Sequence, residues 1–151
     1  MQIISRSVKE TLNLGRLLAG HLQAGDIICL EGELGSGKTV FSKGIAEGLG
    51  VNKAKVTSSS FILIREHLEG RIPLYHFDLY RLKDPGDIAA VGYEEYFYGE
   101  GVAVIEWAEK LDYLRPKEHL MVELSYRGKN ARRLKFSAGA ARYKKIIQGL
   151  K

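Results

Sequence analysis

The chain alternates between short apolar runs and segments in which apolar residues recur every four positions, a pattern that predicts an α/β fold. A capping box at Ser7–Glu10 begins a predicted helix from Val8 to about Leu22, whose leucines are spaced four residues apart. The run Ile27–Leu30 predicts a strand, and the residues after Thr39 return to helical spacing. The first third of the chain is therefore expected to form a helix, a strand and a second helix.

Two pairs of strand-like segments predict antiparallel hairpins. Residues 61–68 and 72–79 are separated by a short turn of three residues. Residues 120–126 and 132–136 alternate between apolar and polar side chains on either side of a turn that contains Gly128. Neither pair has the long crossover that parallel neighbours need, so each is expected to form a hairpin.

The middle and the end of the chain add one strand and two helices. Asp84–Asp87 breaks the pattern, and residues 88–97 then predict a short helix. Val102–Ile105 is a continuous apolar run, which is typical of a strand buried on both faces of a parallel sheet. A last helix is expected over Ala140–Leu150.

Composition limits the class of protein. The chain has 151 residues, of which 45% are hydrophobic and 27% charged, as expected of one globular domain. It has no run of about 18 apolar residues, and its first residues lack the form of a signal peptide, so a cytoplasmic protein is expected. The formal net charge of +5 is compatible with contact to RNA, but the basic residues are mostly scattered, which favours an ordinary solvated surface.

A phosphate-binding loop follows directly on the strand predicted over Ile27–Leu30. Residues 32–39 match the pattern G-x-x-x-x-G-K-[ST] and stand between a strand and a helix, as such a loop requires. Lys38 is expected to reach the β- and γ-phosphates of a nucleotide, and the Thr39 hydroxyl to ligate Mg²⁺. The loop backbone is expected to surround the phosphate oxygens, with contributions from Glu33, Gly35, Ser36, Gly37 and Val40.

With this loop in place, the predicted fold is a P-loop NTPase-like three-layer αβα sandwich, with a mixed, partly parallel sheet and antiparallel hairpins. A single domain over residues 1–151 is expected.

Two acids come at the ends of predicted strands. Asp78 stands near the end of the second hairpin strand, and Glu106 directly follows the buried run Val102–Ile105. Because ligands of open α/β sheets bind at the carboxyl ends of strands, both acids are expected on the edge that carries the phosphate loop. Carboxylates are ligands that Mg²⁺ accepts beside phosphate oxygens and Thr39. Asp78 and Glu106 are therefore predicted to be metal ligands and, with Lys38, catalytic residues, although one of them could position the attacking water instead.

Three further features allow two readings each. The segment Thr57–Ser60 could sense the γ-phosphate through its hydroxyl groups or form an ordinary solvated turn. His76 and Trp107 stand beside the acids, where they could contact a ligand, but residues of these types are more often partly buried packing groups.

Four classes of protein are compatible with the loop alone. A small-molecule kinase needs a lid that excludes water from the γ-phosphate, and no obvious insertion for one is present. A GTPase is disfavoured because Asn52–Lys55 lacks the aspartate of the guanine-reading motif N-K-x-D. An ATPase and a binding module that uses ATP without hydrolysing it both stay open.

The motifs outside the loop resemble the bacterial TsaE family, formerly called YjeE. The resemblance rests on the phosphate loop, the sequence HFDLYRL over residues 76–82 and the pair Glu106–Trp107, in this order over most of the chain. It implies a small P-loop ATPase that uses ATP and Mg²⁺ and acts with the proteins TsaB and TsaD. Together these make threonylcarbamoyladenosine in tRNA, and whether this chain contacts tRNA directly stays open.

The resemblance also implies roles for individual residues. By matching position, Lys38 and Thr39 bind phosphate and Mg²⁺, and Asp78 and Glu106 serve the metal and hydrolysis. Thr11 and Trp107 fall where family members approach the nucleotide, and one arginine of the pair Arg132–Arg133 is implied to do likewise. The family pattern S-P-T-F is replaced by SSSF over residues 58–61. Ser60 keeps the hydroxyl for the nucleotide, whereas Ser59 removes a proline that would stiffen the loop.

Overall fold

The described part of the chain forms a single mixed β-sheet with helices on both faces. The computed structural model describes residues 1–57 and 63–150. The strands are β1 (Gln2–Ser5), β2 (Ile27–Glu31), β3 (Ile64–His67), β4 (Leu74–Asp78), β5 (Val102–Glu106), β6 (Leu120–Tyr126) and β7 (Arg132–Ala138). The α-helices are α1 (Val8–Ala19), α2 (Lys38–Gly48), α3 (Pro85–Ala89), α4 (Tyr93–Phe97) and α5 (Ala141–Gly149), and the 3₁₀ helices are η1 (Lys53–Lys55) and η2 (Ala108–Leu114).

The strand order confirms a partly parallel sheet with antiparallel hairpins. It runs β1-β7-β6-β2-β5-β4-β3. The central strands β4, β5, β2 and β6 are parallel, whereas β3 pairs antiparallel with β4, and β7 pairs antiparallel with both β6 and β1. Both expected hairpins are present, and the carboxyl ends of β2, β4 and β5 meet at one edge of the sheet.

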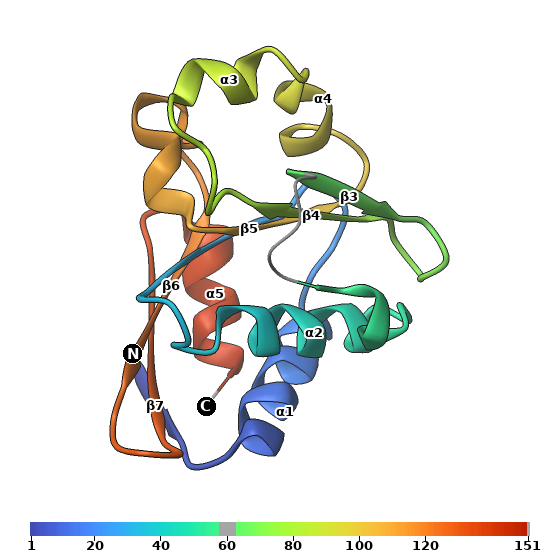
Figure 1. Ribbon diagram of the computed structural model, residues 1–151. Helices are drawn as coiled ribbons and strands as arrows, with labels where there is room; N and C mark the ends of the chain where they lie inside the picture. The colour runs from blue at the N-terminus through green and yellow to red at the C-terminus, as the bar shows by residue number, and fades with distance from the viewer. Residues whose placement is uncertain (58–62, 151) are drawn as a thin grey trace.

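Two apolar layers cover the sheet, as the three-layer prediction requires. Figure 1 shows α1, α2 and α5 on one side of the sheet and α3 and α4 on the other. Along β2, Ile28 and Leu30 pack into the first layer, and Ile27 and Cys29 pack into the second. Successive side chains of a strand point to opposite faces, so a continuous apolar run is the sequence that a strand covered on both faces needs.

Helix α1 begins as predicted but ends earlier. The backbone N–H of Glu10 donates to Ser7 Oγ over 3.1 Å, which confirms the capping box. The helix ends at Ala19 and not at about Leu22, because the N–H groups of His21 and Leu22 bond to carbonyls three residues earlier. The last turn is thus tightened to 3₁₀ geometry, while Leu22 stays buried in the core and keeps the apolar spacing that extended the prediction.

The helix predicted over residues 88–97 is wrong in its extent, since two short helices replace it. The chain turns between α3 and α4 at Gly92, which has a φ of 73°. The supposed break at Asp84–Asp87 is instead the beginning of α3: the Asp84 side chain accepts a hydrogen bond from Gly86 N over 2.9 Å, and Pro85 occupies the first turn. The last predicted helix is confirmed, as α5, within one residue at each end.

Some elements of the fold were not predicted by the pattern of apolar and polar residues. Strand β1 has only two apolar residues and is held by pairing to β7 at the far end of the chain. The 3₁₀ helix η2 was not predicted either. The first hairpin strand, expected over residues 61–68, is found as β3 at Ile64–His67, and residues 58–62 lie outside the described residues. Within the described ranges, no helix has the length and apolar character that crossing a bilayer would take.

The buried imidazole of His67 predicts a loss of stability in mild acid. Its Nε2 is buried without a hydrogen-bond partner among the residues that the structure describes, and burial lowers the pKa of His67 from 6.5. The unfolded chain therefore takes up this proton at a higher pH than the folded chain, so stability is present above pH 6.5 and is lost as the pH falls below it. Wild-type protein is expected to lose more thermal stability than His67→Gln between pH 7.5 and pH 5.5.

The measurement is the melting temperature of both proteins at the two pH values, with the exposed His21→Gln as the matched control. An equal acid-induced decrease in wild type and His67→Gln would contradict the assignment.

Candidate functional site

The phosphate loop joins the end of β2 to the start of α2 with a helix N-terminus that no side chain caps. Gly37 occupies the N-cap position with a φ of 106°, a left-handed conformation that favours glycine. Its side-chain hydrogen cannot accept a bond from the first N–H groups of α2, which are left available. An uncapped helix N-terminus behind a glycine-rich turn is suited to bind an anion such as phosphate.

Lys38 is buried with its ammonium group against the loop. Its Nζ donates to the carbonyls of Gly32 and Glu33 over 2.5 and 2.9 Å, and it lies 3.9 Å from the centroid of the Trp107 ring. Burial lowers the pKa of Lys38, and the carboxylates of Glu106, Glu109 and Asp78 oppose this shift. A cation held among phosphate-loop atoms and acids is placed to exchange these partners for phosphate oxygens.

Glu106 is the most connected buried acid of the site. Its carboxylate accepts a hydrogen bond from Thr39 Oγ1 over 2.8 Å and lies 3.1 Å from Ser42 Oγ and 2.5 Å from His76 Nε2. The side chain is 1% exposed. A buried carboxylate needs such partners to be stable, and these partners also fix its orientation toward Thr39.

Asp78 joins Glu106 at the same edge of the sheet. The two residues are register partners on the parallel strands β4 and β5, and both line one cavity with Thr39. Carboxylate and hydroxyl oxygens are the ligands that Mg²⁺ prefers, so this donor set fits the metal. The described residues include no group of three or more His, Cys, Asp and Glu that could hold a metal alone, so further oxygens would come from phosphate and water.

Trp107 has a strained backbone at the site. Its φ and ψ are 60° and 43°, in the left-handed region, which costs a non-glycine residue about 1–3 kcal/mol. The ring packs against Tyr80 with centroids 5.1 Å apart and ring planes tilted by 48°, and it covers Lys38. Strained residues persist where the surrounding contacts hold them and are common in ligand sites, so Trp107 is a candidate ligand contact and not only a packing group.

Two cavities flank the loop and share Gly35 and Gly37 in their walls. The first, of about 370 Å³, is lined by Lys38 and Thr39 together with the acids and Trp107. The second, of about 250 Å³, is lined by Thr11, Val40 and Arg132 on the other side of the loop. One cavity thus offers a cation, a hydroxyl and carboxylates, and the other extends the site toward α1 and β7.

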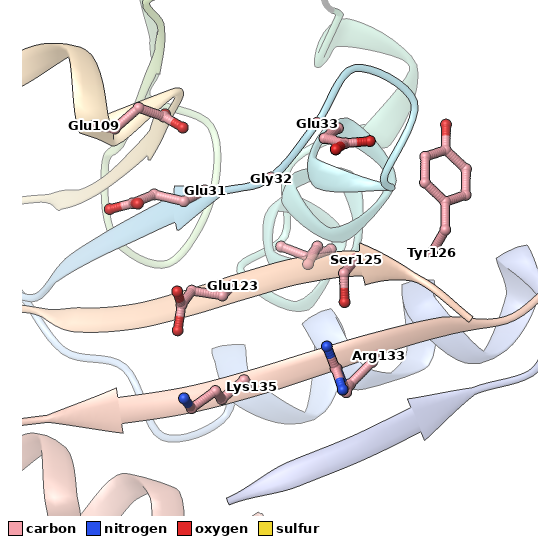
Figure 2. A pocket seen from close by; sticks show the side chains of 10 residues that line it. Glu31, Gly32, Glu33, Glu109, Glu123, Ser125, Tyr126, Arg133 and Lys135 are labelled. Atoms are coloured by element: carbon pink, nitrogen blue, oxygen red, sulfur yellow. The ribbon is translucent and has the colours of Figure 1, made fainter.

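A third cavity, of about 640 Å³, is larger than these two and differs from them in its charge. Figure 2 shows acidic side chains around this cavity, with two basic side chains on β7, the strand next to β6. The acids are Glu31, Glu33, Glu109 and Glu123, and the bases are Arg133 and Lys135. Four carboxylates would repel a triphosphate, so the two smaller cavities beside the loop are the better nucleotide site despite their size.

The structure brings most of the predicted site residues together but separates some of them. Lys38, Thr39, Asp78, Glu106 and Trp107 share the first cavity, and Gly35, Gly37 and Val40 line both.

Ser36 is buried in the loop, with its N–H bonded to the Glu33 carbonyl. The Glu33 side chain lies in the acidic cavity, so only its backbone joins the loop. The Thr11 hydroxyl is bonded to Ser5 and Ser7, and Ser60 lies outside the described residues.

Sequence reasoning missed Ser42 and underrated His76, which both contact Glu106. Ser42 follows Lys38 by one helical turn, a spacing that could have placed it on the same face of α2. His76 is two residues before Asp78 and therefore points to the same face of β4. Its contact with Glu106 on β5 could not be predicted from the sequence.

A strand, a glycine-rich loop with an adjoining lysine and threonine, and an uncapped helix N-terminus define a nucleotide-binding protein of the P-loop class. Comparisons with known proteins narrow this class. A family model described as threonylcarbamoyl adenosine biosynthesis protein TsaE matches residues 5–134. The chain therefore belongs to the TsaE family.

Individual relatives agree with this membership. The tRNA threonylcarbamoyladenosine biosynthesis protein TsaE of Bacillus subtilis is 39% identical, over 94% of this chain and 88% of that protein. The protein of the same name from Nostoc is 43% identical, over 82% of this chain and 77% of its own length. The crystal structure of Bacillus subtilis YdiB superimposes with a TM-score of 0.84 at 36% identity, over 99% of this chain and 93% of the other.

Proposed function

We propose that this chain is an ATP-binding and ATP-hydrolysing subunit of the machinery that makes threonylcarbamoyladenosine in tRNA, acting with TsaD and TsaB in the cytoplasm. Residues 1–151 would act as one Mg²⁺-dependent ATPase domain. The observation that carries the proposal is the contact between Thr39 Oγ1 and Glu106 Oε1, because it joins the phosphate loop to a buried carboxylate from another strand.

In this proposal the phosphates of the nucleotide lie in the first cavity and its nucleoside portion lies in the second. Lys38 and the N-terminus of α2 would bind the phosphates in the first cavity, where Trp107 excludes water from the ammonium group. Thr11, Val40 and Arg132 would contact the nucleoside portion in the second. This favours Arg132 over Arg133 as the arginine that approaches the nucleotide, since Arg133 faces the acidic cavity.

Three residues would hold the metal, and the two acids would share its chemistry. Thr39, Asp78 and Glu106 supply the hydroxyl and carboxylate oxygens that Mg²⁺ accepts. When bound, the metal would neutralise charge that develops on the phosphate oxygens. Glu106 is fixed by Thr39, Ser42 and His76, so it suits the role of a rigid metal anchor. Asp78 is only partly buried and is placed to orient a water molecule.

A co-purification experiment tests the assembly. Tagged wild-type chain is mixed with TsaD and TsaB homologues in the presence of MgATP, of MgADP or of no nucleotide. We expect retention of both proteins and a dependence on nucleotide, because a shallow phosphate site is completed most simply by a partner surface. Absence of TsaD and TsaB under all three conditions would count against the tRNA-modification complex while leaving nucleotide binding open to separate measurement.

A further inference from the structure

Two side chains at the turn end of the β6–β7 hairpin reach the phosphate loop. The Tyr126 hydroxyl donates to the carbonyl of Leu34 over 2.9 Å, and Arg132 Nη2 donates to the carbonyl of Gly35 over 3.3 Å. Tyr126 and Arg132 face each other in the register of the two strands, and the guanidinium carbon lies 4.5 Å from the centroid of the tyrosine ring. Figure 2 shows the Tyr126 ring standing beside the loop.

These contacts set the direction of the loop amides. In a planar trans peptide, the C=O of one residue and the N–H of the next point in opposite directions. Holding the Leu34 carbonyl against Tyr126 therefore turns the Gly35 N–H away from the hairpin. Holding the Gly35 carbonyl likewise fixes the Ser36 N–H, which donates to the Glu33 carbonyl over 3.0 Å and closes the turn.

The loop backbone approaches the hairpin too closely for a side chain at the contact. A Cβ built on Gly35 would lie 2.4 Å from the Tyr126 hydroxyl oxygen, and the φ of Gly35 is 80°. The contact thus depends on a residue without Cβ, and the glycine of the motif serves the fit to Tyr126 as well as access for phosphate.

We propose that Tyr126 and Arg132 are positioning residues that hold the phosphate loop in its binding conformation before a nucleotide arrives. Tyr126 acts through the loop and not by contact with the nucleotide, because it lines neither of the two cavities assigned to the nucleotide. Stacking of the guanidinium on the tyrosine ring couples the two side chains, so both carbonyls are held by one unit. The inference rests on the proposed function in one respect, namely that the loop binds a nucleotide.

The test is Tyr126→Phe, which removes the hydroxyl and keeps the ring under Arg132. Hydrogen–deuterium exchange of residues 32–37, measured without nucleotide, is expected to become faster in the variant. Calorimetric titration with MgADP is expected to show about two- to tenfold weaker binding, the effect of one lost hydrogen bond. Arg132→Lys is expected to give the same faster exchange, since a lysine lacks the planar group that stacks and donates together. Tyr113→Phe, at an exposed tyrosine that lines a cavity with the start of β2, is the matched control.

Unchanged exchange of the loop in Tyr126→Phe would overturn the proposal, and so would faster exchange spread over the whole chain with a lower melting temperature. Wild-type protein that binds no MgADP would instead refute the proposed function, and faster loop exchange in Tyr126→Phe would still support the positioning role. The two failures are therefore distinguishable.

Discussion

Glu106→Gln is expected to abolish ATP hydrolysis while leaving nucleotide binding largely intact. In the proposed mechanism this side chain serves the metal and the attacking water and not the phosphate cradle, so its loss should lower the rate by about 10²–10⁴-fold. Phosphate release with MgATP measures the rate, and calorimetric titration with MgADP measures binding. Glu123→Gln, at an exposed acid of β6, is the control and should hydrolyse ATP at the wild-type rate.

The choice of substitution separates chemistry from folding. Glutamine can keep a hydrogen bond from Thr39 and one with His76. Glu106→Ala instead leaves two buried side chains, Ser42 and His76, and the half-buried Thr39 without this partner. Leaving a buried polar group unsatisfied costs about 1–3 kcal/mol, so the alanine variant should melt at a lower temperature than the glutamine variant. We expect Glu106→Ala to lose hydrolysis as well and to keep some nucleotide binding. Wild-type phosphate release in both variants would contradict the role of Glu106.

Lys38→Ala is expected to abolish hydrolysis and to weaken nucleotide binding at the same time. A hydrogen bond to a charged group contributes about 1.5–3 kcal/mol, which corresponds to about 10- to 150-fold in affinity. The same titration with MgADP and the same phosphate assay measure both effects. Lys135→Ala removes a lysine from the acidic cavity and should leave both values unchanged.

The two variants together separate an ATPase from a binding module. A module that uses ATP only as an ordering ligand would lose affinity in Lys38→Ala and show no hydrolysis to lose in Glu106→Gln. Unchanged phosphate release in both Lys38→Ala and Glu106→Gln would mean that the measured activity does not come from this site. A decrease of affinity in Lys135→Ala would instead place the nucleotide in the acidic cavity.

Most of the features that depend on residues close in the sequence were predicted correctly, whereas strand pairing between distant segments was not. The capping box at Ser7–Glu10 and the phosphate loop are local, so residues close in the sequence decide them. Helices α3 and α4 were misjudged because apolar spacing continued across Gly92, where the backbone conformation and not the hydrophobic pattern ends the helix. Strand β1 exists by pairing with β7 across nearly the whole chain, and four residues with two apolar positions carry no periodic signal of their own.

The sequence by itself determined that this chain has a phosphate loop with Lys38 and Thr39, and that two acids end strands at the same edge. Its motifs also determined the family. Only the tertiary structure decided that Glu106 bonds to Thr39, Ser42 and His76, because their contact depends on the register of β4 and β5 and on the packing of α2.

The tertiary structure also decided which face of β7 each of the neighbouring arginines Arg132 and Arg133 occupies. Adjacent residues of a strand point to opposite faces, so Arg132 reaches the phosphate loop and Arg133 faces the acidic cavity. The alternation was visible in the sequence, but which face meets the loop depends on the pairing of β7 with β6 and on the position of β6 beside β2. Pairing between distant segments is a property of the folded chain. For that reason the fold, and not the local pattern, decided which arginine faces the phosphate loop.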